Sequence, residues 1–310
     1  METASMKITS AEQAFLNRNQ LPTSYIEHAN QWFSPLANRL VEEFEREKSP
    51  KIIGINGCQG SGKSTLADYL CTAVGDRLNV TTVSLSLDDF YLTKAERKHL
   101  ASSIHPLLET RGVPGTHDVQ LAMDCIQSLS VGEKTVITRF DKSIDDRVDA
   151  TNLMTVEDQI GLIVLEGWCL GALPETAEKL LEPINSLEEN EDSDGIWRNY
   201  VNRAIENEYQ PLFNLVDELI MLKAPSFDRV YQWRLEQEQK MIQRLGRLGR
   251  DALDKSSGVM NEQQILRFIS YFQRVTQNIL EEMPERADHL FKLGESRNIT
   301  DYSQPSKRTE

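Results

Sequence analysis

A glycine-rich segment, GINGCQGSGKST at residues 54–65, is followed directly by an amphipathic run. Four of its residues match the pattern G-x-x-x-x-G-K-[ST]: Gly57, Gly62, Lys63 and Ser64. Backbone N–H groups can converge on a polyphosphate only where β-carbons do not interfere, and glycine removes them. The flanking runs, 51–56 and 63–74, predict a strand and a helix, whose positive dipole end adds to phosphate binding. We therefore predict a loop that binds ATP with Mg²⁺.

The residues of this loop have separate expected roles. Lys63 reaches the β- and γ-phosphates, Ser64 offers its hydroxyl to Mg²⁺, and Thr65 meets the α-phosphate. The predicted nucleotide-binding set is Gly57, Gly60, Ser61, Gly62, Lys63, Ser64 and Thr65. The alternative is an ordinary glycine-rich turn between a strand and a helix. We favour the phosphate-binding loop.

Two neighbouring carboxylates, Asp88 and Asp89, end a β-branched run at residues 79–91. In open α/β sheets ligands bind at the carboxyl edge of the strands. A carboxylate there can accept the proton of a substrate hydroxyl as phosphoryl transfer begins. Side chains alternate along a strand, so the two acids should have different roles. We predict Asp88 as the catalytic base and place Asp89 and Tyr91 in acceptor binding; a helix N-cap or a solvated turn is the alternative.

A third acid, Glu166, ends the apolar run LIVLEGW. An acid in that position of a phosphate-loop protein holds the metal, usually through water, so we predict Ser64 and Glu166 as the magnesium residues. A local pairing or a cap on the Trp168 N–H is the alternative. Zinc is not expected, because the four cysteines form no CxxC pair.

Strand patterns alternate with helix patterns after residue 50. The expected strands are 51–56, 79–91, 134–141, 161–167, 217–225 and 287–294, and the expected helices are 63–74, 118–129, 197–214, 226–246 and 261–283. This alternation predicts an α/β fold of three layers, the P-loop NTPase fold, with a mainly parallel sheet flanked by helices.

The remaining segments lie outside this alternation. Residues 1–49 are expected to form an N-terminal helical extension packed on a kinase domain at 50–294, with Pro35 separating two helices or opening the second. Residues 172–196 are rich in acids, and we expect a surface insertion that is mobile at its tip. We expect the polar tail, 295–310, to fray.

Composition excludes several classes of protein. The net charge of −14 over 310 residues argues against nucleic-acid binding, which needs a basic face. An anionic small molecule is not excluded, because a site can be locally basic. The sequence shows neither a signal peptide nor an apolar run of about 18 residues. Isolated cysteines fit a reducing cytosol. We expect a cytoplasmic protein with a small-molecule partner, no nucleic-acid or membrane partner, and a monomeric or homodimeric state.

Six ordered blocks together resemble the D-glycerate 3-kinase family of P-loop kinases. They are GCQGSGKST, SLDDFYLT, RGVPGTHD, RFDKS with DDR, LEGWCLG and YQWRLEQEQKM. The resemblance covers most of residues 50–293; pantothenate kinase, phosphoribulokinase and uridine kinase are more distantly similar. It implies ATP-dependent phosphorylation of a small-molecule hydroxyl, with D-glycerate as the expected acceptor, to give 3-phosphoglycerate.

The remaining blocks supply candidate cations for an acidic acceptor. Arg binds carboxylates in a bidentate manner, and the expected acceptor-binding residues here are Arg111, His117, Lys142 and Arg147. A solvated charged loop is the alternative for the last two. Kinases of this class close a helical lid that carries Arg over the phosphates, and we predict Arg234 in that catalytic role.

Two other functions remain open. Phosphorylation of pantothenate or a nucleoside would use the same scaffold, although a nucleoside site would need aromatic stacking around the acceptor. A nucleotide-regulated binding module is the non-enzymatic alternative. It would be supported by a guanine-specific N-K-x-D segment, which the sequence lacks.

Overall fold

A six-stranded sheet forms the centre of the computed structural model, which describes residues 8–248 and 261–305. The order across the sheet is β10 (Ile299–Ser303), β9 (His289–Leu293), β8 (Glu218–Lys223), β1 (Lys51–Gly57), β7 (Ile160–Gly167) and β2 (Thr81–Ser86). Neighbouring strands are parallel from β2 to β9, and only β10 runs antiparallel. All of these strands except β10 match expected ones.

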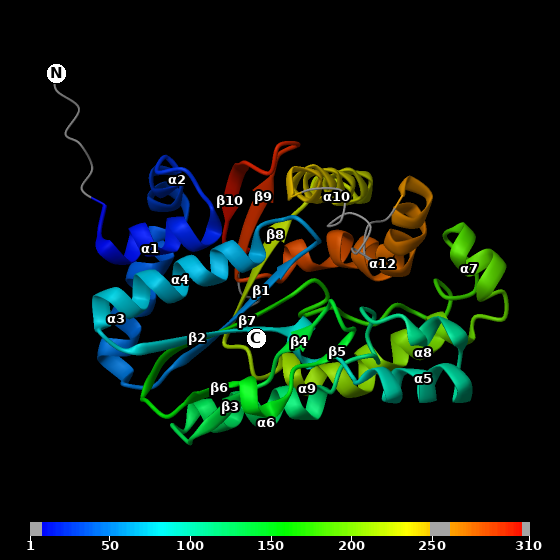
Figure 1. The fold of residues 1–310 in the computed structure, drawn as a ribbon, viewed down its shortest axis with the longest axis horizontal. Coiled ribbons are helices and arrows are strands. Elements are labelled where there is room, and N and C mark those ends of the chain that lie inside the picture. The colour runs from blue at the N-terminus through cyan, green and yellow to red at the C-terminus, as the bar shows by residue number, and fades with distance from the viewer. Residues whose placement is uncertain (1–7, 249–260, 306–310) are drawn as a thin grey trace.

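Helices cover both faces of the sheet, which makes the three layers expected from the sequence (Figure 1). In β7, Leu162 and Val164 belong to one hydrophobic cluster, and Ile163 and Leu165 belong to the other. The first cluster includes residues of α1 (Ser10–Asn19), α2 (Tyr25–Trp32), α3 (Ser34–Glu47), α4 (Lys63–Leu78) and α10 (Phe227–Leu248). The second includes residues of α6 (Val119–Ser130), α8 (Ile196–Ala204), α9 (Gln210–Phe213) and α12 (Glu262–Glu282). A strand buried on both faces explains the continuous apolar runs.

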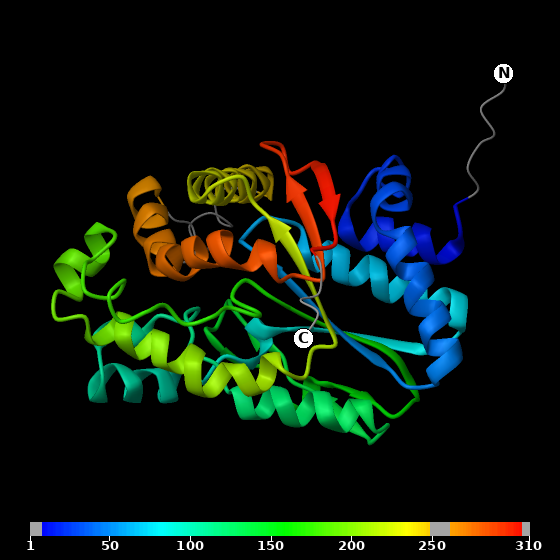
Figure 2. The same cartoon turned by 180° about the vertical axis from the view of Figure 1, so that it is seen from behind.

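The N-terminal helices pack on the sheet (Figure 2). An ion pair also connects α3 to the sheet. Arg39 of α3 donates to both carboxylate oxygens of Glu218 on β8, at 2.7 and 2.5 Å. His289 on β9 lies 2.9 Å from the same carboxylate. Pro35 occupies the first turn of α3, as expected. None of the described helices combines the length and the apolar composition that a membrane crossing requires.

The expected strand at 134–141 does not join the main sheet. It divides into β3 (Thr135–Ile137), which pairs with β6 (Met154–Val156), and β4 (Phe140–Asp141), which pairs with β5 (Asp146–Arg147). Val136 is exposed between two buried neighbours. A strand with only one buried face suits an edge ribbon, whereas a central parallel strand is buried on both faces.

The expectation that the tail frays is wrong for residues 299–303, which form β10. The ring of Tyr302 stacks on Phe291 with a centroid distance of 4.7 Å, and its hydroxyl lies 2.8 Å from Nδ1 of His289. Backbone pairing with β9 and the packing of one aromatic side chain hold this polar edge strand.

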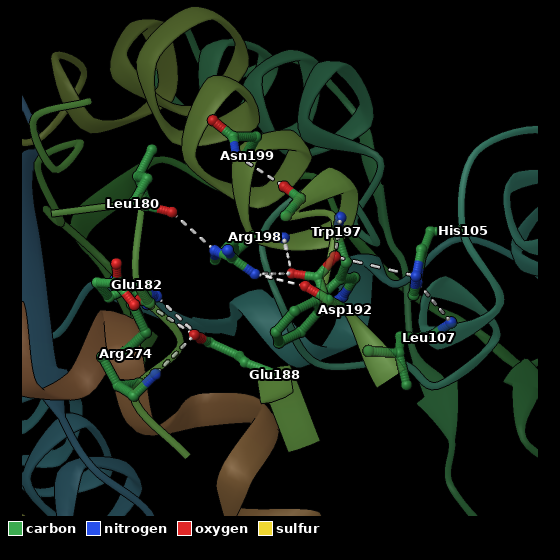
Figure 3. A network of polar contacts seen from close by, with 12 residues as sticks. His105, Leu107, Leu180, Glu182, Glu188, Asp192, Trp197, Arg198, Asn199 and Arg274 are labelled. Atoms are coloured by element: carbon green, nitrogen blue, oxygen red, sulfur yellow. Dashed lines mark hydrogen bonds and ion pairs between the residues drawn. The ribbon is translucent and has the colours of Figure 1, made fainter. Parts of the chain in front are cut away.

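Two acids of the segment 172–196, which was expected to be mobile at its tip, face inward (Figure 3). The segment contains α7 (Ser186–Glu191). The side chain of Glu188 is fully buried and accepts from Arg274 of α12 at 2.6 and 2.8 Å. Asp192 is also buried and accepts from Arg198 of α8 at 3.0 Å. The arginines that neutralise these acids, Arg274 and Arg198, lie outside the segment. The acidic composition of the segment therefore did not indicate that these two side chains are buried.

Candidate active site

The glycine loop connects β1 to α4 at the carboxyl edge of the sheet. Gly60 and Gly62 have φ angles of 79° and 93°, in the left-handed region that favours glycine. A Cβ on Gly57 would lie 2.4 Å from Oγ of Ser61 and 3.2 Å from Cβ of Leu222. The conformation therefore needs glycine at all three positions, and it leaves the N-terminus of α4 facing the loop.

Among the described residues, the buried polar atoms around this loop that lack a hydrogen-bond partner include Oγ of Ser61 and Oε2 of Glu166. Buried polar groups are normally paired, so such atoms need an explanation. A hydroxyl beside a helix N-terminus suits a phosphate oxygen, and a carboxylate oxygen without a hydrogen bond suits a cation or its water. Both atoms fit a site for a magnesium nucleotide.

The residues predicted to hold the metal lie together. Oγ of Ser64 donates to Oε1 of Glu166 at 2.9 Å, and Nζ of Lys63 lies 3.7 Å from Oε2. Among the described residues, no group of three or more His, Cys, Asp and Glu side chains is arranged to hold a metal ion. Mg²⁺ is commonly bound by one or two carboxylates together with waters and substrate phosphates. The donors present therefore fit a Mg²⁺ ion that arrives with the nucleotide.

The carboxylate of Asp88 is held between two donors. Strand β2 ends at Ser86, and Asp88 lies in a 3₁₀ turn, η1 (Leu87–Phe90), so the expected alternation along a strand does not apply. Oδ1 accepts from the Tyr91 hydroxyl at 2.8 Å, and Oδ2 accepts from Nζ of Lys142 at 2.6 Å. Burial raises the pKa of Asp88, but the positive charges of Lys142 and Lys63 outweigh burial and lower it to about 2.

Lys63 and Asp88 influence each other across the site. Burial by itself lowers the pKa of Lys63, but the negative charges of Glu166 and Asp88 outweigh that effect and raise it. Lys63 is therefore a cation at neutral pH, placed between the predicted metal residue and the predicted base.

Asp89 has different partners from Asp88. Its carboxylate pairs with Arg139 and accepts from the backbone N–H of Phe140 at 3.3 Å. These contacts fasten the β4–β5 hairpin to the turn that carries Asp88. Arg139 stands in the block RFDKS but was not among the predicted site residues. Acceptor binding by Asp89 stays a prediction.

The three predicted acceptor cations lie around the β4–β5 hairpin, and each is paired with an acid. Arg111 pairs with Asp145, Arg147 donates to Asp118 at 2.9 Å, and Lys142 pairs with Asp88. Asp118 also caps α6, since its Oδ1 accepts from the Leu121 N–H. Lys142 is 59% exposed, against 28% for Arg111 and 23% for Arg147. Lys142 is therefore the most accessible of the three.

His117 is buried beside Asp88. Its ring stacks on Tyr91 with a centroid distance of 4.5 Å, and its Nδ1 lies 2.5 Å from the hydroxyl of Tyr209. Burial lowers the pKa of His117 to about 4. Tyr209 was not among the predicted site residues, because it lies 92 residues from His117 within an expected helix. The local signal there was Pro211, which cannot continue a regular helix.

A cavity of about 450 Å³ is lined in part by His117 and by none of the glycine-loop residues. Its charged lining residues are Asp118 and Glu208, and no Lys or Arg lines it. An acid would be repelled there, so the cations of the hairpin are the better place for an acidic ligand.

Arg234, the predicted lid residue, lies on α10. Its guanidinium is 5.6 Å from the ring centroid of Phe268 on α12. This contact joins two helices, and a role over the phosphates stays a prediction.

Comparison with known proteins shows which proteins this chain resembles. No family model matches the sequence. It is 32% identical over 251 residues to the uncharacterized kinase mug58 of Schizosaccharomyces pombe, covering 76% of this chain and 85% of that protein. It is 30% identical over 238 residues to the chloroplastic D-glycerate 3-kinase of Arabidopsis thaliana, covering 72% of this chain and 46% of that protein.

A solved structure has the same fold. The structure of D-glycerate 3-kinase from Cryptococcus neoformans var. grubii superposes with a TM-score of 0.68 at 23% identity. The match covers 87% of this chain and 98% of that one.

Proposed function

Since the chain belongs to the D-glycerate 3-kinase family of P-loop kinases, we propose that it transfers the γ-phosphate of ATP to a hydroxyl of a small acid, D-glycerate. That the protein is a kinase follows from its relatives. The acceptor and the residue roles below are the proposal. The observation that carries it is the convergence of Lys63, Glu166 and Asp88 at one edge of the sheet.

The chemistry assigned to each residue follows from its charge and place. The backbone of the glycine loop and Lys63 hold the β- and γ-phosphates. Ser64 and Glu166 hold Mg²⁺, which neutralises phosphate charge when it is bound. Asp88 accepts the proton of the acceptor hydroxyl, and Lys63 balances the negative charge of the transferred group.

The acidic character of the acceptor is supported by the hairpin cations. Lys142 donates to Asp88 and is the most exposed of the three cations. A carboxylate bound by Lys142 would bring the terminal C3 hydroxyl of the same small molecule within reach of Asp88. Arg111 and Arg147 are positioned around the same hairpin and add positive charge.

The test is ADP formation, followed in a coupled assay with a panel of acceptors. D-glycerate is compared with lactate, which lacks the terminal hydroxyl, and with glycerol, which lacks the carboxylate. Pantothenate and uridine represent the alternative acceptors. We expect stimulation by D-glycerate alone, 3-phosphoglycerate in the ³¹P NMR spectrum, and no stimulation in Lys63→Ala.

The panel also identifies the competing outcomes. If pantothenate or uridine stimulates ADP formation instead, the assigned acceptor is wrong and the assignment as a kinase stands. Tight binding of MgATP without turnover of any acceptor would contradict the proposal.

We further propose a cytosolic location. Four cysteines are free and buried: Cys58, Cys71, Cys125 and Cys169. Unpaired thiols suit a reducing compartment. Fluorescence microscopy of the tagged protein tests this.

A further inference from the structure

Within the described part of the chain, the hydroxyl of Tyr209 has hydrogen-bond partners in the loop 111–118. The Gly115 N–H donates to Oη at 3.0 Å, and Nδ1 of His117 lies 2.5 Å from the same oxygen. The Gly115 N–H can only donate, so it uses one lone pair of Oη. The hydroxyl hydrogen needs an acceptor, and among the described residues only Nδ1 of His117 offers one. Tyr209 therefore donates to Nδ1, and a neutral His117 carries its proton on Nε2.

His117 is neutral at physiological pH, because burial lowers its pKa to about 4. Its Nε2 atom is buried and has no partner among the described residues. A buried N–H donor without an acceptor is unfavourable, and native structures seldom keep one without a ligand or water. Nε2 is thus a donor that a bound molecule can satisfy.

The loop that carries His117 is joined to the turn that carries Asp88. The Leu92 N–H donates to the carbonyl of Thr116 at 2.9 Å, and the Asp118 N–H donates to the carbonyl of Phe90 at 2.7 Å. These two bonds join the loop 111–118 to the turn that carries Asp88. The ring of His117 stacks on Tyr91, whose hydroxyl donates to Asp88.

An irregular helical turn places Tyr209. Residues Ile205–Tyr209 form a π-helical turn, η4, between α8 and α9. Pro211 has no N–H, so a regular helix cannot continue through it. The side-chain amide of Gln210 donates to the carbonyl of Ile205 at 3.0 Å and to that of Ala172 at 2.9 Å. Such turns change the direction of the side chains that follow and are frequent at functional sites.

We propose that Tyr209 is a positioning residue of the acceptor site, which holds His117 as the Nε2–H tautomer so that Nε2 donates to an oxygen of the bound acceptor beside Asp88. This rests on the proposed function, because it assumes an acceptor with oxygen atoms near Asp88. A purely structural role for Tyr209 is the competing explanation.

The first test compares two tyrosine variants. Tyr209→Phe removes only the hydroxyl. Tyr200→Phe is the matched control, because Tyr200 contacts the carbonyl of Gly115 in the same loop at 3.4 Å. For the acceptor that the panel identifies, we expect Tyr209→Phe to raise KM about tenfold, the effect of one lost hydrogen bond to a charged group. The KM for MgATP should stay unchanged, and Tyr200→Phe should change neither value by more than about twofold.

The second test uses amides that mimic each ring nitrogen. The side-chain nitrogen of Gln in His117→Gln can replace Nε2–H, whereas that of Asn in His117→Asn reaches only the Nδ1 position. We expect His117→Gln to keep an acceptor KM at least about fivefold lower than that of His117→Asn. Equal KM values in the two variants would count against a donor at Nε2.

The third test reads the tautomer directly and needs no acceptor. Histidine ring nitrogens are observed by ¹⁵N NMR, and the His117 signals are those missing from His117→Gln. We expect the proton on Nε2 in the wild type and a redistribution to Nδ1 in Tyr209→Phe. A wild-type proton on Nδ1 overturns the proposal, as does an acceptor KM that is the same in Tyr209→Phe and Tyr200→Phe. A wrong substrate assignment would instead appear in the acceptor panel with the tautomer unchanged.

Discussion

Nζ of Lys142 lies 2.6 Å from Oδ2 of Asp88, while the Tyr91 hydroxyl donates to Oδ1 at 2.8 Å. Both oxygens of the proposed base are therefore occupied by donors. The lysine comes from a hairpin and the tyrosine from the residues after η1. An acceptor carboxylate that draws Lys142 toward itself would free one oxygen of the base, so acceptor binding and base activation would be linked.

We predict that Lys142→Met moves the acid limb of the pH–rate profile upward by about one unit. The positive charge of Lys142 lowers the pKa of Asp88, so its loss raises that pKa and protonates the base at a higher pH. Steady-state kinetics between pH 2 and 7 measure the shift, and they should also show a higher KM for the acid. Lys134→Met is the control, because Lys134 pairs with the exposed Glu157. An acid limb that stays in place would show that Lys142 does not act on the base.

We predict that Asp88→Asn lowers kcat by about 10²–10⁴, the usual contribution of a general base. Asp89→Asn should lower kcat much less, because the Asp89 carboxylate is bound to Arg139 and the Phe140 N–H. Calorimetric titration with MgATP should give similar affinities for both variants. Equal losses of kcat in the two variants would contradict the assignment of the base.

We predict that Arg274→Met lowers the free energy of unfolding by about 3 kcal/mol, because it leaves the buried charge of Glu188 without its partner. Arg267→Met is matched to it, since Arg267 of the same helix pairs with Glu191 of the same segment but is 48% exposed. That variant should lose less than about 1 kcal/mol. Urea unfolding measures both. Similar losses of unfolding free energy in the two variants would mean that burying the Glu188–Arg274 pair does not increase its contribution to stability.

We predict that Glu218→Gln is less stable than the wild type at pH 7 and that the difference disappears near pH 2. Burial raises the pKa of Glu218, but His289 and Arg39 outweigh burial and lower it to about 2. A lowered folded-state pKa stabilises the fold above the ordinary carboxyl pKa, and this stabilisation is lost as the pH falls toward 2. The expected difference at pH 7 is about 2–3 kcal/mol.

Urea unfolding at pH 7, 4 and 3 checks this dependence. Glu281→Gln is the control, because Glu281 is 73% exposed. A difference between Glu218→Gln and the wild type that persists unchanged at pH 3 would contradict it.

The sequence by itself determined the elements whose signals are local. The glycine loop with Lys63 and Ser64, the apolar strands and the long helices were predicted, because a glycine turn and a hydrophobic period depend on residues a few positions apart. The separate ribbons at β3 and β4 and the edge strand β10 were not predicted, because a short strand is defined by the partner it pairs with.

Only the tertiary structure decided which charges meet. Glu188 and Arg274 are 86 residues apart, and His117 and Tyr209 are 92 residues apart. Burial and pairing depend on residues that are close in space. The sequence therefore predicted that Glu188 is solvated, whereas the fold buries it completely. The sequence could place Asp88 at the edge of the sheet, but the donors on its two oxygens come from the packing of a hairpin and a turn against that edge.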